Sequence, residues 1–344
     1  MPLKHLQIFS LLLISVAGPV AASAQTSTES SQRPSDAQSA GTASVEFRGI
    51  PVPPEAANLP GIQALLNRDD WPAAERQCRE ILSTNSSSAD AHYLLGYTLY
   101  REGKAVDSLH AYTAAAALRR PQAADLMAVA ADYVLLLDYN DADIWFTKAT
   151  EWNPGDVLGW YYRGRAEYKR EKYADALAAF QKALSLDPKN PRIADNLGLT
   201  LEMLGDTEKA KNAFLSAIQM ETSNPSGYSL PYLNLGMLLI SNNDLHGGLP
   251  LLERAVAMSP ANPKAHEELA RAYQQKGDYA ASERELHAAL AEAPDVPSLH
   301  FLLGRVYEKE GMSKKAEEEF QRTAALNAKQ VSSEVPDRVA PSSK

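Results

Sequence analysis

Apolar and polar positions recur along most of the chain with a helical spacing. Between residues 61 and 328, small and bulky apolar residues follow one another at steps of 3, 4 and 7, which places them on one face of an α-helix. Glycine and proline separate these runs, because a helix C-terminus favours glycine and proline denies the next backbone hydrogen bond. The pattern predicts an all-α chain built from pairs of helices joined by short turns.

The pattern itself repeats every 34 residues, with one interval of 38 residues. A first small residue occurs at Gly96, Ala130, Gly164, Gly198, Gly236, Ala270 and Gly304. A second occurs at Ala74, Ser108, Ala142, Ala176, Ala210, Gly248, Ser282 and Ala316. A bulky residue stands four positions later, at Cys78, Tyr112, Phe146, Phe180, Phe214, Leu252, Leu286 and Phe320. Small side chains let two helices approach closely, the bulky one fills the remaining space, and stacking buries the faces left over.

This arrangement resembles the tetratricopeptide repeat (TPR), with its A-x3-F-x2-A pattern and a closing proline at Pro154, Pro188, Pro260 and Pro294. The resemblance implies an all-α, right-handed superhelical solenoid of about eight 34-residue helix-turn-helix units over residues 61–328. The units are expected to start near residues 55, 89, 123, 157, 191, 229, 263 and 297. The 38-residue interval precedes Gly247, Gly248 and Pro250, so residues 223–252 are predicted to be the weakest part.

The two ends of the chain have a different composition. Residues 1–24 predict a signal peptide, because Lys4 and His5 precede a short apolar run and Ala22-Ser23-Ala24 forms an A-x-A cleavage site. Residues 25–60 predict a disordered tether, with twelve Ser, Thr or Gln in positions 25–44 and prolines thereafter. Residues 329–344 predict a disordered C-terminal tail. The mature protein is therefore expected to be exported, periplasmic or secreted, without a membrane span.

Charge and cysteine content narrow the choice of partners. Lys and Arg total 34 and Asp and Glu 43, a net charge of −9 that argues against nucleic acid. Cys78 is the single cysteine, so an internal disulfide is excluded. Its place in the bulky column predicts burial, while an intermolecular bridge leaves a homo-oligomer open.

No catalytic or metal-binding motif is complete. His266-Glu267 begins like the H-E-x-x-H zinc motif, but Ala270 stands where the second histidine is required. His92, His266 and His300 occupy the position of Trp160 in other repeats, which predicts packing rather than ligation. The sequence therefore predicts a non-enzymatic protein without metal or cofactor.

Residues 160–173 (WYYRGRAEYKREKY) combine aromatic and basic side chains, which divide by helical face. Trp160, Gly164 and Tyr173 match core columns, and Arg163 and Glu167 are spaced for a partly buried ion pair. The fourth repeat carries seven basic and four acidic residues, a charge of +3.

Candidate ligand-binding residues are those left over after the core columns are assigned: Tyr93, Tyr97, Tyr100, Arg101, Tyr161, Arg165, Tyr168, Lys169, Asn196 and Asn234. Tyrosine and arginine are enriched at binding hot spots. The resemblance implies that these side chains line a concave groove holding an extended peptide or a partner protein. The alternative is carbohydrate stacked on the tyrosines, as in an accessory factor for polysaccharide export or envelope assembly.

Overall fold

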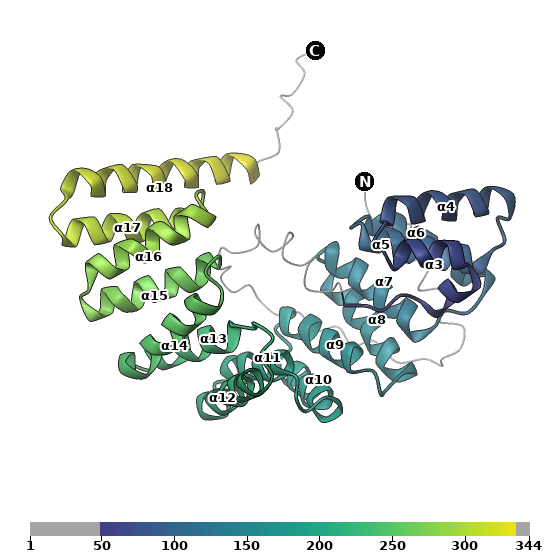
Figure 1. Ribbon diagram of the computed structural model, residues 1–344, viewed down its shortest axis with the longest axis horizontal. Helices are drawn as coiled ribbons and strands as arrows, with labels where there is room; N and C mark the ends of the chain where they lie inside the picture. Colours follow the sequence, from purple (N-terminus) through teal and green to yellow (C-terminus); the bar gives the residue numbers. More distant parts are fainter. Residues whose placement is uncertain (1–48, 335–344) are drawn as a thin grey trace, which may run out of the picture. The chain divides into compact units, whose positions relative to one another are not determined.

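The structure is a computed structural model that describes residues 49–334. The predicted signal peptide and most of the predicted tether lie outside the described residues. Within residues 49–334 the chain forms sixteen α-helices and one 3-10 helix, with no strand (Figure 1). In order these are η2 (Pro54–Asn58), α3 (Pro60–Leu66), α4 (Trp71–Thr84), α5 (Ala89–Arg101), α6 (Ala105–Leu118), α7 (Ala123–Leu135), α8 (Tyr139–Trp152), α9 (Val157–Lys169), α10 (Tyr173–Leu186), α11 (Pro191–Met203), α12 (Thr207–Ser223), α13 (Leu230–Ser241), α14 (Leu245–Met258), α15 (Pro263–Lys276), α16 (Tyr279–Glu292), α17 (Pro297–Lys309) and α18 (Ser313–Glu334).

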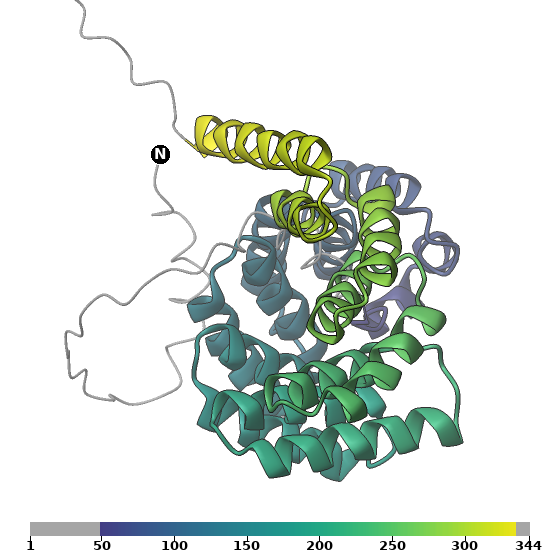
Figure 2. The ribbon, with the colours of Figure 1, turned by 90° about the vertical axis from the view of Figure 1, so that its left-hand side faces the viewer.

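Consecutive helices pair into eight hairpins, one for each predicted repeat. Repeat 1 is α3 with α4, repeat 2 is α5 with α6, and the series continues to repeat 8, which is α17 with α18. The two helices of each C-terminal hairpin lie side by side (Figures 1 and 2). The first helices of repeats 2 to 8 begin within one residue of the predicted starts. The predicted all-α repeat architecture is confirmed.

The eight repeats form two compact units. The N-terminal unit ends at Pro188 and contains repeats 1 to 4, and the C-terminal unit begins at Lys189 and contains repeats 5 to 8. Within each unit the second helix of one repeat also packs on the first helix of the next, as α8 packs on α9 and α14 on α15. This boundary precedes the 38-residue interval that the sequence singles out.

Close approach of the two helices in a hairpin depends on the small and bulky columns. A Cβ added to Gly164 would lie 2.9 Å from Cε1 of Phe180, and one added to Gly198 would lie 2.5 Å from Cε1 of Phe214. The same relationship, over 16 residues, joins Gly96 to Tyr112, Gly236 to Leu252 and Gly304 to Phe320. A Cβ at these positions would lie closer to the facing side chain than Cβ atoms lie in real structures. Glycine therefore allows the close approach of the two helices.

The turn inside every repeat contains one residue with a left-handed backbone. Four of these residues are Gly103, Gly205, Gly277 and Gly311, as expected for a helix C-terminus. The other four repeats place a side chain there, at Asp69, Leu137, Glu171 and Asn243, with φ between 55° and 65°. The following N–H bonds the carbonyl five residues earlier in each turn, for example Lys104 to Leu99 at 2.9 Å. One turn geometry therefore serves all eight repeats, with or without glycine.

Two predictions about packing are confirmed. Nε of Arg163 donates a 2.9 Å hydrogen bond to Oε1 of Glu167, which is buried. The ring nitrogens of Trp160 and His266 bond the backbone carbonyl six residues earlier, at 3.0 and 2.9 Å. His92 and His300 make the equivalent bond. The histidines thus close the turn between repeats.

The boundaries of the predicted tether and tail need correction. Residues 49–60 belong to the predicted tether, yet Ile50, Glu55 and Ala56 are buried, because apolar side chains in this stretch pack on the N-terminal unit. Helix α18 continues to Glu334, past the predicted end at residue 328, since residues 324–334 contain no proline and no glycine.

Candidate functional site

The candidate site in the N-terminal unit is the surface formed by corresponding positions of α5 and α9. These positions are Tyr93, Tyr97, Tyr100 and Arg101 in repeat 2 and Tyr161, Arg165, Tyr168 and Lys169 in repeat 4, which lie 68 residues further on. We refer to this surface as the first-helix face. The structure treats the two sets differently.

In repeat 2 the tyrosines are not an open surface. Tyr93 and Tyr97 are fully buried and Tyr100 is 5% exposed, so the prediction that they line an open groove is wrong. Residues 49–58 of the same chain, here called the N-terminal segment, contribute to this cover, because their helix η2 packs on α5 and Ile50 bonds Tyr97. The sequence could not show this cover, since the segment lies more than 30 residues before the tyrosines.

The backbone of the N-terminal segment is bound by tyrosine hydroxyl groups. The hydroxyl of Tyr97 donates a 3.1 Å hydrogen bond to the carbonyl oxygen of Ile50 and accepts one of 2.8 Å from Arg101. The N–H of Gly49 donates a 3.2 Å hydrogen bond to the hydroxyl of Tyr162 in repeat 4. Repeats 2 and 4 therefore hold backbone groups of two neighbouring residues in the N-terminal segment.

The buried acidic side chain of the segment is held by polar side chains that are themselves partly exposed. Oε1 of Glu55 accepts hydrogen bonds from Arg119 at 2.8 Å and from Gln122 at 2.7 Å. Arg119 also bonds Asp90 at 3.1 Å, and Nδ2 of Asn58 bonds Asp90 at 2.9 Å. Burial alone would lower the pKa of Arg119, but these two carboxylates hold it above its ordinary value. Charge complementarity therefore fixes the register of the segment on repeats 2 and 3.

In repeat 4 the corresponding residues are more accessible. Tyr161, Arg165 and Tyr168 are half-buried and Lys169 is exposed. The guanidinium of Arg165 lies 5.8 Å from the ring centre of Tyr161, which itself contacts the ring of Phe180. Repeat 4 therefore combines the aromatic and basic character of repeat 2 with partial exposure.

The two predicted residues of the C-terminal unit have internal partners. Asn196 bonds the carbonyl of Arg192 in its own helix, and Asn234 donates a 2.9 Å hydrogen bond to the buried carboxyl of Asp195. The hydroxyl of Tyr228 bonds the other oxygen of Asp195 at 2.7 Å. Burial raises the pKa of Asp195 to about 6, although these two bonds lower it in part. Asn234 thus contributes to a buried network rather than to a groove.

Several residues that bind the segment were absent from the sequence prediction. Arg119, Gln122 and Tyr162 contact it, and Ile50 and Glu55 supply its buried side chains. One signal was available, because GIPVPPE is the first stretch after residue 24 that combines apolar residues with prolines.

Profiles of the tetratricopeptide repeat match residues 61–124, 191–224 and 239–300, and a TPR repeat profile matches residues 164–205. These ranges fall on the hairpins described above. The chain is a tetratricopeptide repeat protein.

Other TPR proteins show the same fold at low identity. The chain is 29% identical over 106 residues to the uncharacterized TPR repeat-containing protein At1g05150 of Arabidopsis thaliana, covering 30% of this chain and 13% of that relative. A tetratricopeptide repeat protein from Parabacteroides merdae superposes with a TM-score of 0.58 at 16% identity, over 77% of this chain and 99% of its own. A chain of the APC/C hetero-tetramer Cut9-Hcn1 gives 0.57 at 16%, over 71% and 48% respectively. At these identities the similarity concerns the fold.

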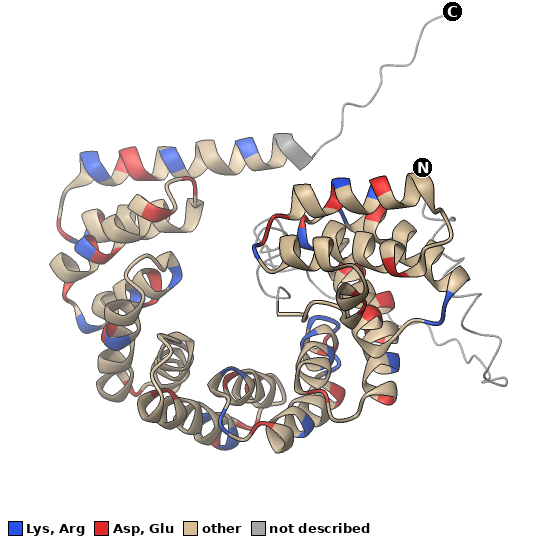
Figure 3. Cartoon of the chain, turned by 45° about the vertical axis from the view of Figure 1, so that its right-hand side comes forward, with Lys and Arg blue, Asp and Glu red and all other residues tan. Residues whose placement is uncertain are grey.

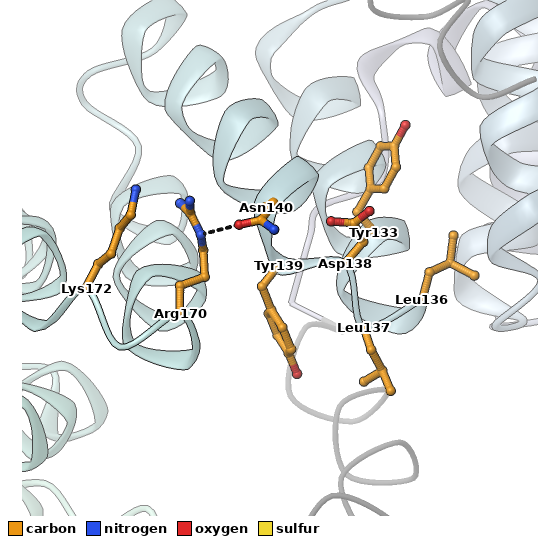
Figure 4. A pocket seen from close by; sticks show the side chains of 8 residues that line it. All are labelled: Tyr133, Leu136, Leu137, Asp138, Tyr139, Asn140, Arg170 and Lys172. Atoms are coloured by element: carbon orange, nitrogen blue, oxygen red, sulfur yellow. Dashed lines mark hydrogen bonds between the residues drawn. The ribbon is translucent and has the colours of Figure 1, made fainter. Parts of the chain in front are cut away.

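Outside the first-helix face, this TPR protein has a hollow of about 560 Å³ at the turns of repeats 3 and 4 (Figure 4). Tyr133, Tyr139, Arg170 and Lys172 are among the residues that line it. Nε of Arg170 donates a 2.9 Å hydrogen bond to Asn140, and its guanidinium also pairs with Asp143. Arg170 of repeat 4 therefore bonds residues of repeat 3.

Metal-binding and reactive groups are scarce in the described part of the TPR repeats. Residues 49–334, as far as they are described, contain no cluster of three or more His, Cys, Asp or Glu suited to a metal ion. In the same range no helix is both long and apolar enough to cross a membrane. Cys78 is fully buried, as predicted, and burial raises the pKa of its thiol to about 12. Basic and acidic residues are interspersed along the helices (Figure 3).

Proposed function

We propose that this chain is an exported, non-enzymatic scaffold of a bacterial cell envelope or periplasm that binds an extended peptide or partner protein on its first-helix face. The observation that carries the proposal is the N-terminal segment itself. Gly49 and Ile50 are held through their backbone groups by Tyr162 and Tyr97. A surface that binds peptide backbone in this way suits polypeptides in general, because every sequence offers these groups.

The surface of repeat 4 is where the partner would bind. Tyr161, Arg165, Tyr168 and Lys169 give repeat 4 an aromatic and basic surface like that of repeat 2, and they are more exposed than their counterparts. Repeat 4 carries an excess of three positive charges in a chain of net charge −9, which favours a partner with acidic side chains. The predicted signal peptide supports an envelope location, and the hetero-tetramer containing Cut9 offers a precedent for this fold in a protein assembly.

Site-specific photocrosslinking tests the proposal. A photoreactive residue placed at Lys169 on α9 is expected to trap a protein in the intact cell envelope. The same residue at Lys182, which is exposed on α10 of the same repeat, is the control. An adduct at 169 and none at 182 supports the first-helix face as the binding surface. Equal trapping at both positions, or trapping at 182 alone, would place the partner elsewhere.

A further inference from the structure

The N-terminal segment is rich in proline, and its second half is the 3-10 helix η2 (Pro54–Asn58). Residues 49–58 read GIPVPPEAAN, with prolines at positions 51, 53 and 54. Residues 50–53 form no helix or strand, and Pro53 has φ −58° and ψ 142°, close to polyproline II values. Such a conformation is pre-formed by proline and is recognised elsewhere by grooves lined with aromatic side chains.

The groove beneath the segment has that aromatic lining. Tyr97 and Tyr162 bond its backbone, Tyr93 bonds the carbonyl of Arg119 at 2.6 Å, and the rings of Tyr97 and Trp71 meet edge to face. The guanidinium of Arg101 lies 4.2 Å from the centre of the Trp71 ring. If the segment left, the hydroxyl groups of Tyr97 and Tyr162 that bond its backbone would become available to another ligand.

Two side chains of the segment define what the groove selects. Ile50 is 2% exposed, so an apolar side chain is required at this point. Glu55 lies five residues later and is 3% exposed, and its carboxylate meets Arg119 and Gln122. An apolar residue followed by prolines and then by a glutamate is therefore the pattern that the groove reads.

The segment fits the groove incompletely. Oε2 of Glu55 is buried, and it makes no hydrogen bond to any residue that the structure describes. A buried carboxylate oxygen without a partner weakens the complex that contains it. A competing ligand whose carboxylate has both oxygens hydrogen-bonded in the groove would bind more tightly than the chain's own segment does.

We propose, as a refinement that rests on the proposed function, that the groove of repeats 2 to 4 binds a proline-rich segment of a partner protein with an apolar residue five positions before a glutamate. The N-terminal segment occupies this groove as an internal ligand, which the partner displaces. Because the segment is covalently attached, its effective concentration is high, so only a matching peptide or a multivalent partner replaces it.

A fluorescent peptide of sequence GIPVPPEAAN tests the proposal on the full-length chain. In the opened variant Ile50→Ala/Glu55→Gln, the internal ligand loses its two selective side chains, and we expect the peptide to bind at least tenfold more tightly than to the wild type. The control is Val106→Ala/Glu80→Gln, which makes the same kind of changes at exposed positions of the same unit. A peptide with glutamine in place of its glutamate should bind the opened variant at least tenfold more weakly. Equal binding of the two peptides, or no gain in the opened variant, overturns the proposal.

Hydrogen exchange on the wild type provides a second readout that needs no substitution. With the peptide bound in excess, residues 49–58 should exchange faster, because they leave the groove. Bound peptide with unchanged exchange there would mean a different site and would overturn the proposal. Sedimentation velocity completes the test. If the chain is a dimer without the peptide and the peptide dissociates this dimer, then a second copy of the chain occupies the groove. That result would overturn the proposal of a partner protein. Trapping at position 169 tests the scaffold function independently of these outcomes.

Discussion

The ring of Phe180 in α10 lies directly against the backbone of Gly164 in α9, where a Cβ would come within 2.9 Å of Cε1. This pair sets the distance between the two helices of repeat 4. The same pairing of a small and a bulky residue recurs in the other repeats, for example between Gly236 and Leu252. The repeat period in the sequence is thus the interval at which this contact recurs along the chain.

Replacing Gly164 with a larger residue should therefore destabilise the protein, although glycine is a weaker helix former than alanine or leucine. We expect Gly164→Leu to lower the free energy of unfolding by about 1–3 kcal/mol, the usual cost of overpacking. Gly155→Ala is the control, because the nearest atom to its added Cβ is 3.7 Å away. Thermal melting checks both variants. Combining Gly164→Ala with Phe180→Leu, the pairing that Ala270 and Leu286 form in repeat 7, should recover part of any loss, and no recovery would contradict the packing account.

The turn of repeat 3 should gain stability from glycine. Leu137 has φ 59° and is 46% exposed, so its side chain adds backbone strain and little packing. We expect Leu137→Gly to raise the free energy of unfolding by about 0.5–1 kcal/mol, since relief of strain exceeds the entropy that glycine adds to the unfolded chain. Gly103→Leu, at the same turn position of repeat 2, should lower it. A lower melting temperature for Leu137→Gly would show that its side chain packs usefully.

Asp132 should make stability depend on pH. It is fully buried, and its Oδ2 lies 2.5 Å from Oγ of Ser108, whose hydroxyl also reaches the carbonyl of Gly96. Burial raises the pKa of Asp132 well above its ordinary value, and the bond with Ser108 offsets only part of this. A carboxyl group whose pKa is higher in the folded chain contributes fully below its unfolded pKa, about 3.9, and loses its contribution as the pH rises towards the folded value.

Asp132→Asn removes this titration while keeping the shape and a donor for Ser108. Relative to this variant, we expect the wild type to lose stability as the pH rises above about 3.9, with a slope of at most about 1.4 kcal/mol per pH unit. Denaturant unfolding at several pH values measures the difference, with Asp175→Asn as the exposed control. Parallel pH profiles for the wild type and Asp132→Asn would contradict a protonated Asp132.

The stability of the loop within the 38-residue interval should depend on Glu221. Its carboxylate accepts hydrogen bonds from the N–H groups of Ser226, Gly227 and Tyr228 and from the hydroxyl of Ser226. Burial alone would raise the pKa of Glu221, but these bonds together lower it, so its contribution is present above the ordinary carboxyl pKa and is lost as the pH falls through the lowered value. We expect Glu221→Gln to cost about 1.5–3 kcal/mol, typical of bonds to a charged acceptor.

Hydrogen exchange locates the effect of Glu221→Gln. The amides of Ser226, Gly227 and Tyr228 should exchange faster, whereas Glu208→Gln, an exposed change on the same helix, should leave them unchanged. Identical exchange in the two variants would mean that the loop is held by other contacts.

The repeat architecture could be predicted from the sequence because it depends on residues close together along the chain. Gly164 and Phe180 are 16 positions apart, and repeats 2 to 8 all have a small and a bulky residue at this spacing. The period is therefore visible even though repeat 1 departs from it. The left-handed backbone at the turns could be predicted only in the repeats that have glycine there. Leu137 and Glu171 adopt the same backbone without a signal, because the fold imposes this geometry on residues that do not favour it.

The candidate site could be predicted only in part, because exposure depends on distant segments. Tyr97 and Arg165 occupy the same position in repeats 2 and 4, but Ile50 bonds the first and not the second. Helical periodicity says which face a residue is on, and it cannot say what covers that face. The lower stability expected for residues 223–252 stays a prediction, and the bonds of Glu221 show why composition alone is a weak guide there.

The central claim is that the first-helix face of repeat 4 binds a partner polypeptide. Arg165→Ala/Lys169→Ala tests it without removing the rings of Tyr161 and Tyr168, which pack on Phe180 and Tyr173. Lys172→Ala/Lys182→Ala is the matched control, because it removes the same charge from exposed positions of the same repeat. The measurement is the affinity of each variant for the protein trapped at position 169. The account predicts affinity at least tenfold lower for the first variant, about 1.4 kcal/mol, with melting unchanged and the control binding like the wild type. Equal affinities for both variants and the wild type would contradict it.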